Sequence, residues 1–273
     1  MATDAAARAL QGTLSLRFAL RAGQTRLVEA ARTPPLQVQR LLPIDPAAPG
    51  LAGVLLLNGT AGLFAGDRLR ITVAVEAGAT VAIGTPAMTR AFAMPAGDAA
   101  VETALRIAAN ARLEYLPEPT LLCAGAHLRQ RLRIDVEPGA AVAAGEVIAF
   151  GRVAHGELHA YRHFVQETEL WRAGRPVLVE RLLLSPAQAD VGLGALGDAA
   201  AYGSLSLLCP PAQTETLLAQ VRALLNARCD VWGGASLLHE DAGVAVRLLG
   251  ASATSVQALA RAIVRLSRAP WRA

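Results

Sequence analysis

Between residues 13 and 209 the chain alternates apolar and polar side chains with a period of two. Residues 14–18 and 68–73 carry the pattern most clearly. Such alternation turns one face of a β-strand inward and the other toward solvent. Turn-like sequences interrupt it, as at Glu76-Ala77-Gly78 and Glu137-Pro138-Gly139. The pattern predicts a succession of short strands without an amphipathic helix.

The triplet Leu-Arg-Ile recurs three times in this region, at 69–71, 105–107 and 132–134. Each copy is followed by a turn candidate and then by a second apolar stretch; the turn candidates are Gly78, Asn110 and Gly139. Repeated strand–turn–strand units predict a mainly β fold with stacked or β-helical two-layer sheets. An ordinary β-sandwich is the alternative.

After residue 210 the apolar residues follow a helical period. One expected helical face comprises Leu217, Leu218, Val221, Leu224 and Leu225. A second comprises Val256, Leu259, Ile263 and Leu266, with Ser252 or Thr254 as its N-cap. Between them, Ser236–Leu249 is expected to form a hairpin that turns at 241–243. We therefore expect a β-rich domain at 1–210 and an α-β-β-α element at 211–273 packed on it, with one single domain as the alternative.

Composition narrows the class of protein. The chain has 273 residues, of which 53% are hydrophobic and 18% charged, which indicates a globular protein. All 26 basic residues are Arg, the formal net charge is +4, and aromatic residues make up 4%, so a stacking platform for nucleic acid is not expected. Cys123, Cys209 and Cys229 are scattered, as expected of reduced thiols in a cytoplasmic protein. No signal peptide and no membrane-spanning stretch of ~18 apolar residues is expected.

The common catalytic motifs are absent from the sequence. It contains no G-x-S-x-G, no G-x-x-x-x-G-K-[ST] and no H-E-x-x-H. His155, His159 and His163 are spaced four apart, and neutral imidazoles in a row suit nickel or zinc. Gly156 interrupts a helix there and no Cys lies nearby, so three separate histidines are the simpler interpretation.

Three acidic residues are the best candidates for a functional site. Asp67 follows Gly66 in a turn, where a local backbone or Arg contact would hold its carboxylate. Glu146 and Glu180 each lie in an apolar run, where a carboxylate is costly to bury unless it is paired, hydrated or bound to a cation. Ion pairs with Arg68, Arg152 or Arg181 are the structural alternative.

The order of several short motifs resembles the UreD (also called UreH) family. The segments that carry the resemblance are Pro34-Pro35-Leu36-Gln37-Val38-Gln39-Arg40, the Ala65-Gly66-Asp67-Arg68-Leu69 ending of 59–69, Gly84-Thr85-Pro86-Ala87-Met88-Thr89-Arg90, Leu113-Glu114-Tyr115-Leu116-Pro117-Glu118, Glu146 with Gly151-Arg152 and Gly156-Glu157, and 171–181 ending in Val179-Glu180-Arg181. The resemblance spans roughly residues 12 to 270. Gly145 departs from it, since the family has Trp before this Glu.

The resemblance implies a urease maturation chaperone and not an enzyme. It implies a part of a hetero-oligomer with UreF, UreG and urease apoprotein, and a water-filled passage for transient Ni²⁺ with no tightly bound cofactor. The acidic positions of that passage correspond to Asp67, Glu146 and Glu180. Two other functions stay open: an enzyme that uses paired carboxylates, and a generic β-rich interaction protein unrelated to nickel.

Overall fold

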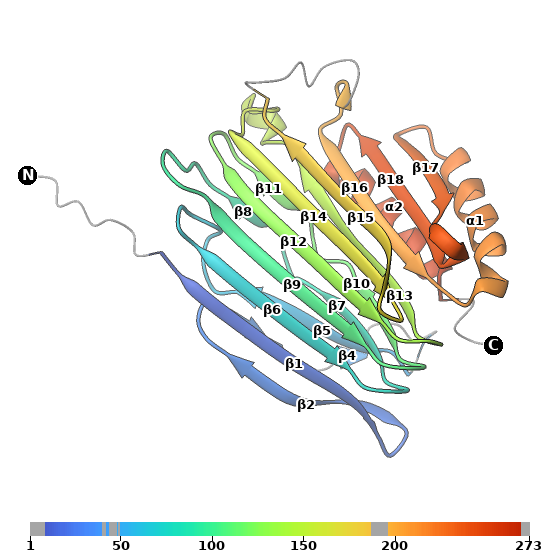
Figure 1. Ribbon diagram of the computed structural model, residues 1–273. Helices are drawn as coiled ribbons and strands as arrows, with labels where there is room; N and C mark the ends of the chain where they lie inside the picture. Colours follow the sequence, from blue (N-terminus) through green and yellow to red (C-terminus); the bar gives the residue numbers. More distant parts are fainter. Residues whose placement is uncertain (1–8, 40–41, 44–47, 49, 187–195, 269–273) are drawn as a thin grey trace, which may run out of the picture.

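Two β-sheets pack face to face, and two helices cover part of the outer face of one of them (Figure 1). The computed structural model describes residues 9–39, 42–43, 48, 50–186 and 196–268. Within them, the first sheet has seven strands in the order β15-β14-β12-β9-β6-β1-β2. These are β1 (Gln11–Arg21), β2 (Gln24–Arg32), β6 (Arg68–Val75), β9 (Ala99–Ile107), β12 (His127–Val136), β14 (His163–Arg172) and β15 (Arg175–Leu184).

The second sheet follows the order β17-β18-β16-β13-β10-β7-β5-β3, with three short strands attached beside this path. The strands on the path are β3 (Leu36–Val38), β5 (Ala52–Asn58), β7 (Thr80–Gly84), β10 (Arg112–Tyr115), β13 (Ala141–Ala149), β16 (Ala201–Leu208), β17 (Val231–Leu237) and β18 (Gly243–Gly250). The attached strands are β4 (Leu42–Pro43), β8 (Thr89–Ala91) and β11 (Thr120–Leu122).

The chain winds between the sheets as a solenoid. From β6 to β14 it passes repeatedly from the first sheet to the second and back, and equivalent strands of successive coils pair in parallel: β6 with β9, β9 with β12 and β12 with β14. In the second sheet β7 pairs with β10 and β10 with β13, also in parallel. The mainly β prediction with β-helical two-layer sheets is thus confirmed.

Three predicted turns stack on one another where the coils cross between the sheets. Gly78, Asn110 and Gly139 have φ values of 73°, 59° and 77°. This left-handed conformation favours Gly and Asn, because other side chains clash with their own backbone. The next residue of each turn is a fully buried alanine; these are Ala79, Ala111 and Ala140. Backbone bonds join the turns, such as Arg112 N to Ala79 O at 2.9 Å.

The Leu-Arg-Ile triplets mark strands of the solenoid, but they are not its structural repeat. Leu105 of β9 lies beside Val73 of β6 and Ile134 of β12, and not beside the leucines of the other two triplets. The turns set the register between coils, because their stacking fixes which residues of neighbouring strands face each other. The triplets therefore fall at different heights in β6, β9 and β12.

The C-terminal elements form a second core on the outer face of the second sheet. Helix α1 (Pro211–Asn226) begins with proline at its first turn, where no backbone N–H is needed. Helix α2 (Ala253–Leu266) begins after Ser252, whose side chain accepts from Thr254 N, so Ser252 is the N-cap. The predicted face of α1 packs mainly against β17 and β18, and that of α2 against β16, β13 and β18. Strands β17 and β18 form the predicted hairpin as part of the same sheet as β16.

Two further features bear on the sequence expectations. Cys123 and Cys209 are buried and Cys229 is exposed, and all three are free thiols. Among the described residues, no helix is long and apolar enough to cross a bilayer. The sequence boundary at residue 210 falls between β16, which ends at Leu208, and α1, which begins at Pro211.

Candidate functional site

A line of polar side chains crosses the apolar core between the two sheets. In the second sheet, Glu146, Ser204 and Arg247 lie directly beside one another on β13, β16 and β18. In the first sheet, Gln130 pairs in register with Gln166, and Thr168 with Glu180. We call this set the polar row; its members are Gln130, Glu146, Gln166, Thr168, Glu180, Ser204 and Arg247.

Glu146 is the most deeply placed acid of the polar row. Its side chain is 8% exposed, and its Oε2 accepts a hydrogen bond of 2.7 Å from Gln166 Nε2 of the opposite sheet. Burial raises the pKa of this carboxyl above its ordinary value of 4.5, and the bond from Gln166 offsets part of that rise. A carboxyl in this position is costly to keep ionised unless a further partner compensates for its lost hydration.

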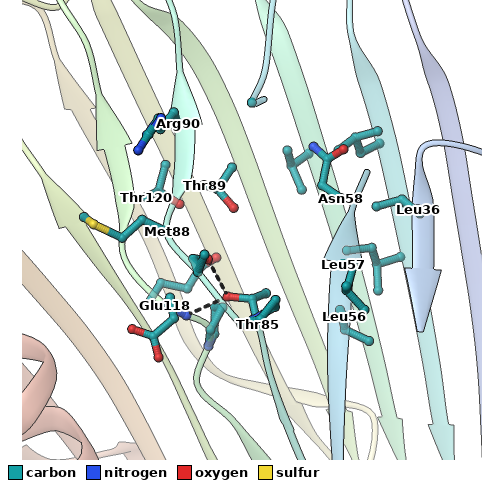
Figure 2. Close-up of a pocket in the computed structure, with 18 of the residues that line it drawn as sticks. Leu36, Leu56, Leu57, Asn58, Thr85, Met88, Thr89, Arg90, Glu118 and Thr120 are labelled. Carbon is teal, nitrogen blue, oxygen red and sulfur yellow. Dashed lines mark hydrogen bonds between the residues drawn. The ribbon is translucent and has the colours of Figure 1, made fainter. Parts of the chain in front are cut away.

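A pocket of about 370 Å³ lies on one side of Glu146, between the sheets. Its lining comes from β3, β5, β6, β9, β10, β12 and β13 together with the segment 85–90. Figure 2 shows Thr85, Met88 and Arg90 on one side of this pocket and Asn58 with the leucines of β5 on the other. The hydroxyl of Thr85 accepts from Glu118 N at 2.9 Å and donates to Ala87 O at 3.1 Å, which fixes the loop.

Polar atoms gather where Glu146 and Gln130 meet this pocket. Gln130 is 9% exposed, and its Oε1 has no hydrogen-bond partner within the described residues. Tyr115 lines the same pocket; burial raises the pKa of its hydroxyl, and the charge of Glu146 adds to the rise. A buried carbonyl oxygen without a hydrogen-bond partner lowers the stability of the fold and is unusual between two packed sheets. Carbonyl and carboxylate oxygens are also the ligands that hard cations bind.

A second, much smaller cavity lies on the other side of Glu146. It measures about 10 Å³ and is lined by Gln166, Thr168, Ser204 and Ser206, among others. A space of this size holds about one water molecule when polar groups surround it. Glu146 lines both cavities, so it stands between the large pocket and the small cavity beside Ser204.

Glu180 and Arg247 form the far end of the polar row, at the edge of the first sheet. Arg247 Nε donates to Glu180 Oε1 at 2.7 Å and Nη2 donates to Oε2 at 2.6 Å. Ser204 Oγ donates to Glu180 Oε2 at 3.3 Å. The two side chains are 28% and 29% exposed, so the end of the row reaches solvent.

The ion pairs suggested for the candidate acids named the wrong arginines, although Glu180 does form an ion pair. Its partner is Arg247, 67 residues further along the chain. The three suggested arginines bind other acids: Arg68 pairs with Asp98, Arg152 with Glu157 and Arg181 with Glu167.

Asp67 stands apart from the polar row. It is 4% exposed, its Oδ1 accepts from Leu10 N at 2.8 Å, and its Oδ2 accepts from Phe64 N at 2.9 Å. These bonds hold the loop before β6 against the start of β1, as expected for a carboxylate held by local backbone contacts. Neither Asp67 nor Glu180 lines the two cavities beside Glu146. Glu180 is connected with Glu146 through Ser204, which is the register partner of Glu146 and bonds to Glu180, whereas Asp67 has no such link within the described part of the chain.

The three spaced histidines do not converge. His155 ends the short 3₁₀ helix Val153–His155 and is exposed. His159 Nε2 lies 3.1 Å from Ala199 O, and His163 Nδ1 lies 2.5 Å from Ser185 Oγ. Among the described residues, no three His, Cys, Asp or Glu side chains are grouped so that they could hold a metal ion. The simpler interpretation, three separate histidines, is the one that the structure supports.

Sequence reasoning missed Gln130, Gln166, Ser204 and Arg247. A signal for them exists, since each occupies an inward position on a strand whose inward residues are otherwise mainly apolar. In β14 the inward residues are Phe164, Gln166, Thr168 and Leu170. Polar residues at inward positions of a strand are more informative than polar residues on its outer face.

Comparisons with known proteins agree with the resemblance in the motifs. The profile of the family described as UreD urease accessory protein matches residues 10–273. The chain is 34% identical to urease accessory protein UreD 2 of Streptomyces griseus, over 93% of this chain and 89% of the relative. It is 32% identical to urease accessory protein UreD of Haloarcula marismortui, over 90% and 82%, and 29% identical to that of Actinobacillus pleuropneumoniae serotype 7, over 90% and 93%. The chain belongs to the UreD family of urease accessory proteins.

Proposed function

We propose that this chain is a cytoplasmic urease maturation chaperone that delivers nickel to urease apoprotein together with UreF and UreG. It acts as a scaffold in a hetero-oligomer, it has no reaction of its own, and Ni²⁺ passes along the polar row between the sheets. The observation that carries the proposal is Glu146, a buried carboxyl placed between a pocket of about 370 Å³ and a small cavity lined in part by Ser204, the residue that bonds to Glu180. Family membership supports the connection with urease.

The chemistry of the polar row suits a travelling divalent cation. Its members offer carboxylate, amide and hydroxyl oxygens, and no Cys or His belongs to it. Oxygen ligands in small number bind Ni²⁺ more weakly than imidazole or thiolate ligands, so the ion can leave again. Conduction of an ion requires weak, spaced binding sites. Each site must bind the ion strongly enough for the ion to enter and weakly enough for it to leave. No tightly bound cofactor is needed for this role.

Catalysis by paired carboxylates has less support. A general acid and a general base must converge on one reacting atom, with environments that separate their pKa values. Glu146 and Glu180 lie toward opposite ends of the row, and Glu180 is engaged in a bidentate bond with Arg247. A β-rich interaction protein unrelated to nickel would gain nothing from an acid buried between its sheets.

The test is the nickel content of urease purified from cells that express the urease genes with variants of this chain. Glu146→Gln and Glu180→Ala should lower nickel per active site and urease activity several-fold, because each removes an oxygen ligand from the row. Glu102→Gln is the matched control: Glu102 is an exposed acid that pairs with Arg70 on the same sheet. Asp67→Asn tests whether the third candidate acid takes part.

Assembly is measured in the same cells by a pull-down with UreF. Variants that assemble normally but load nickel poorly support a passage. Full nickel content with both Glu146→Gln and Glu180→Ala would exclude a route through these residues, whatever the assembly.

A further inference from the structure

Arg247 places a fixed positive charge against the last carboxylate of the polar row. Both oxygens of Glu180 accept from its guanidinium, and Arg247 Nη1 also donates to Val246 O at 2.8 Å and to Leu205 O at 3.3 Å. A planar guanidinium that binds both oxygens of a carboxylate takes the place that a cation would use. A divalent ion therefore cannot bind Glu180 while Arg247 stays where the structure has it.

Open space lies next to Arg247 on the neighbouring strand. Gly234 of β17 is the register partner of Arg247, and a Cβ built at Gly234 would meet nothing within 4 Å. Trp232, Gly234 and Ser236 share one face of β17, and all three are exposed. The first sheet ends at β15, and Figure 1 shows β17 beyond that edge. The guanidinium thus has room to leave Glu180 in the direction of β17.

The indole ring of Trp232 offers a second position at which the guanidinium of Arg247 can bind. Trp232 pairs with Leu249, so it is the diagonal neighbour of Arg247 on the same face, within reach of a long side chain. Its side chain is 80% exposed and has an open ring face. A guanidinium over an indole gains a cation–π attraction. The molecule already uses such a contact at Arg133, whose guanidinium lies 4.8 Å from the Trp171 ring centroid.

We propose that Arg247 is a gate for divalent cations, closed on Glu180 and open over Trp232. In the closed position the guanidinium neutralises Glu180 and excludes a second cation. In the open position Glu180 is free to bind Ni²⁺ at the end of the polar row. The inference rests on the proposed function, because a travelling cation is what the gate admits.

The experiment measures binding of Ni²⁺ to the purified full chain by equilibrium dialysis. Arg247→Gln removes the competing charge, so the dissociation constant should fall about tenfold, as for a site that becomes permanently competent. Arg247→Met should do the same with a side chain of similar length. Adding Glu180→Gln to Arg247→Gln should abolish the gain. Circular dichroism confirms that each variant is folded.

Trp232→Ala removes the open position alone. It should weaken Ni²⁺ binding several-fold in the unaltered chain but have no effect in the Arg247→Gln background, because the gate is then already absent. The matched control is Arg228→Gln, which frees Asp230 from a similar bidentate pair outside the polar row. It should leave the dissociation constant unchanged.

The gate is wrong if Arg247→Gln and Arg247→Met bind Ni²⁺ within about twofold of the unaltered chain. It is equally wrong if Arg228→Gln tightens binding as much as they do. Either outcome leaves the passage itself to be judged by the nickel content of urease with Glu146→Gln, so the two ideas fail separately.

Discussion

The second sheet has two buried faces, and they hold different chemistry. Toward α1 and α2, the strands β13, β16 and β18 present aliphatic side chains such as Leu205, Val246 and Leu248. Toward the first sheet, the neighbouring positions of the same strands carry Glu146, Ser204 and Arg247. On the helix side the buried neutral side chains bond to backbone carbonyls, as Thr214 does to Asp241 O at 3.1 Å. The buried acid on that side, Glu114 of β10, accepts hydrogen bonds from two nitrogens of Arg268 and lies outside these three strands.

The difference shows that the polar row is not a consequence of the strands themselves. The same three strands make a core without charged groups on one face, so the chain can build such a core on the other. A charged or titratable group inside a sandwich is tolerated only when something compensates for its lost hydration. On the inter-sheet face the compensation comes from Gln166 for Glu146 and from Arg247 for Glu180.

The largest expected effect comes from moving a carboxylate to the helix side. Leu205→Glu places an acid where only aliphatic groups surround it, next to Ser204 on the same strand. The uncompensated charge and the lost packing should cost about 4 kcal/mol or more, measured by urea unfolding. Ser204→Asp is the matched change on the other face and should cost less, since Arg247 is adjacent and offsets part of the repulsion from Glu146 and Glu180. Equal losses would mean that the two faces do not differ.

A smaller effect of opposite sign is expected at Glu146. Burial raises the pKa of its carboxyl, so between its unfolded and folded pKa the folded protein binds more protons than the unfolded chain, and stability falls as pH rises through this range. The Glu146→Gln variant has no carboxyl to ionise, so it does not lose stability as the pH rises. Its free energy of unfolding at pH 7 should exceed that of the unaltered chain by on the order of 1 kcal/mol.

The gain from Glu146→Gln should shrink as the pH falls and vanish well below the ordinary pKa of 4.5, where the carboxyl is protonated in both states. Thermal unfolding across the pH range measures it. A variant that is destabilised equally at every pH would show that the carboxylate supports the fold, contrary to the comparison of the two faces.

The smallest effect is expected at Ser204, in the middle of the row. Its hydroxyl donates to Glu180 Oε2 over 3.3 Å, a long bond to a group that Arg247 already satisfies. Ser204→Ala should change the free energy of unfolding by less than about 0.5 kcal/mol. Chemical denaturation measures this, and a loss above about 1.5 kcal/mol would show that the row is held together as one network.

Much of the fold could be predicted from local sequence. Alternation identified the strands, and Gly78, Asn110 and Gly139 identified the turns because a positive φ restricts residue choice to a few types. The helices after residue 210 follow from a period of 3.6 residues and a serine N-cap. These features depend on neighbours in the chain, and a single sequence contains them.

The arrangement of the site could be predicted only in part. The apolar context of Glu146 and Glu180 marked them as costly, but their partners lie on other strands, and pairing registers are not written in local sequence. Arg247 is 67 residues from Glu180 and carries no motif. Asp67 looked equivalent to the other acids, yet its oxygens serve the backbone of Leu10 and Phe64.

The members of the polar row are aligned in register across neighbouring strands. The row therefore depends on the exact number of residues in every strand. Losing one residue from the middle of β16 would rotate Ser204 toward α2 and bring Leu205 against Glu180, since successive side chains point to opposite faces. Insertions and deletions should therefore be confined during evolution to loops outside both the strands and the stacked turns that set the register between coils. Loop length is thus free to vary, whereas strand length and register are not.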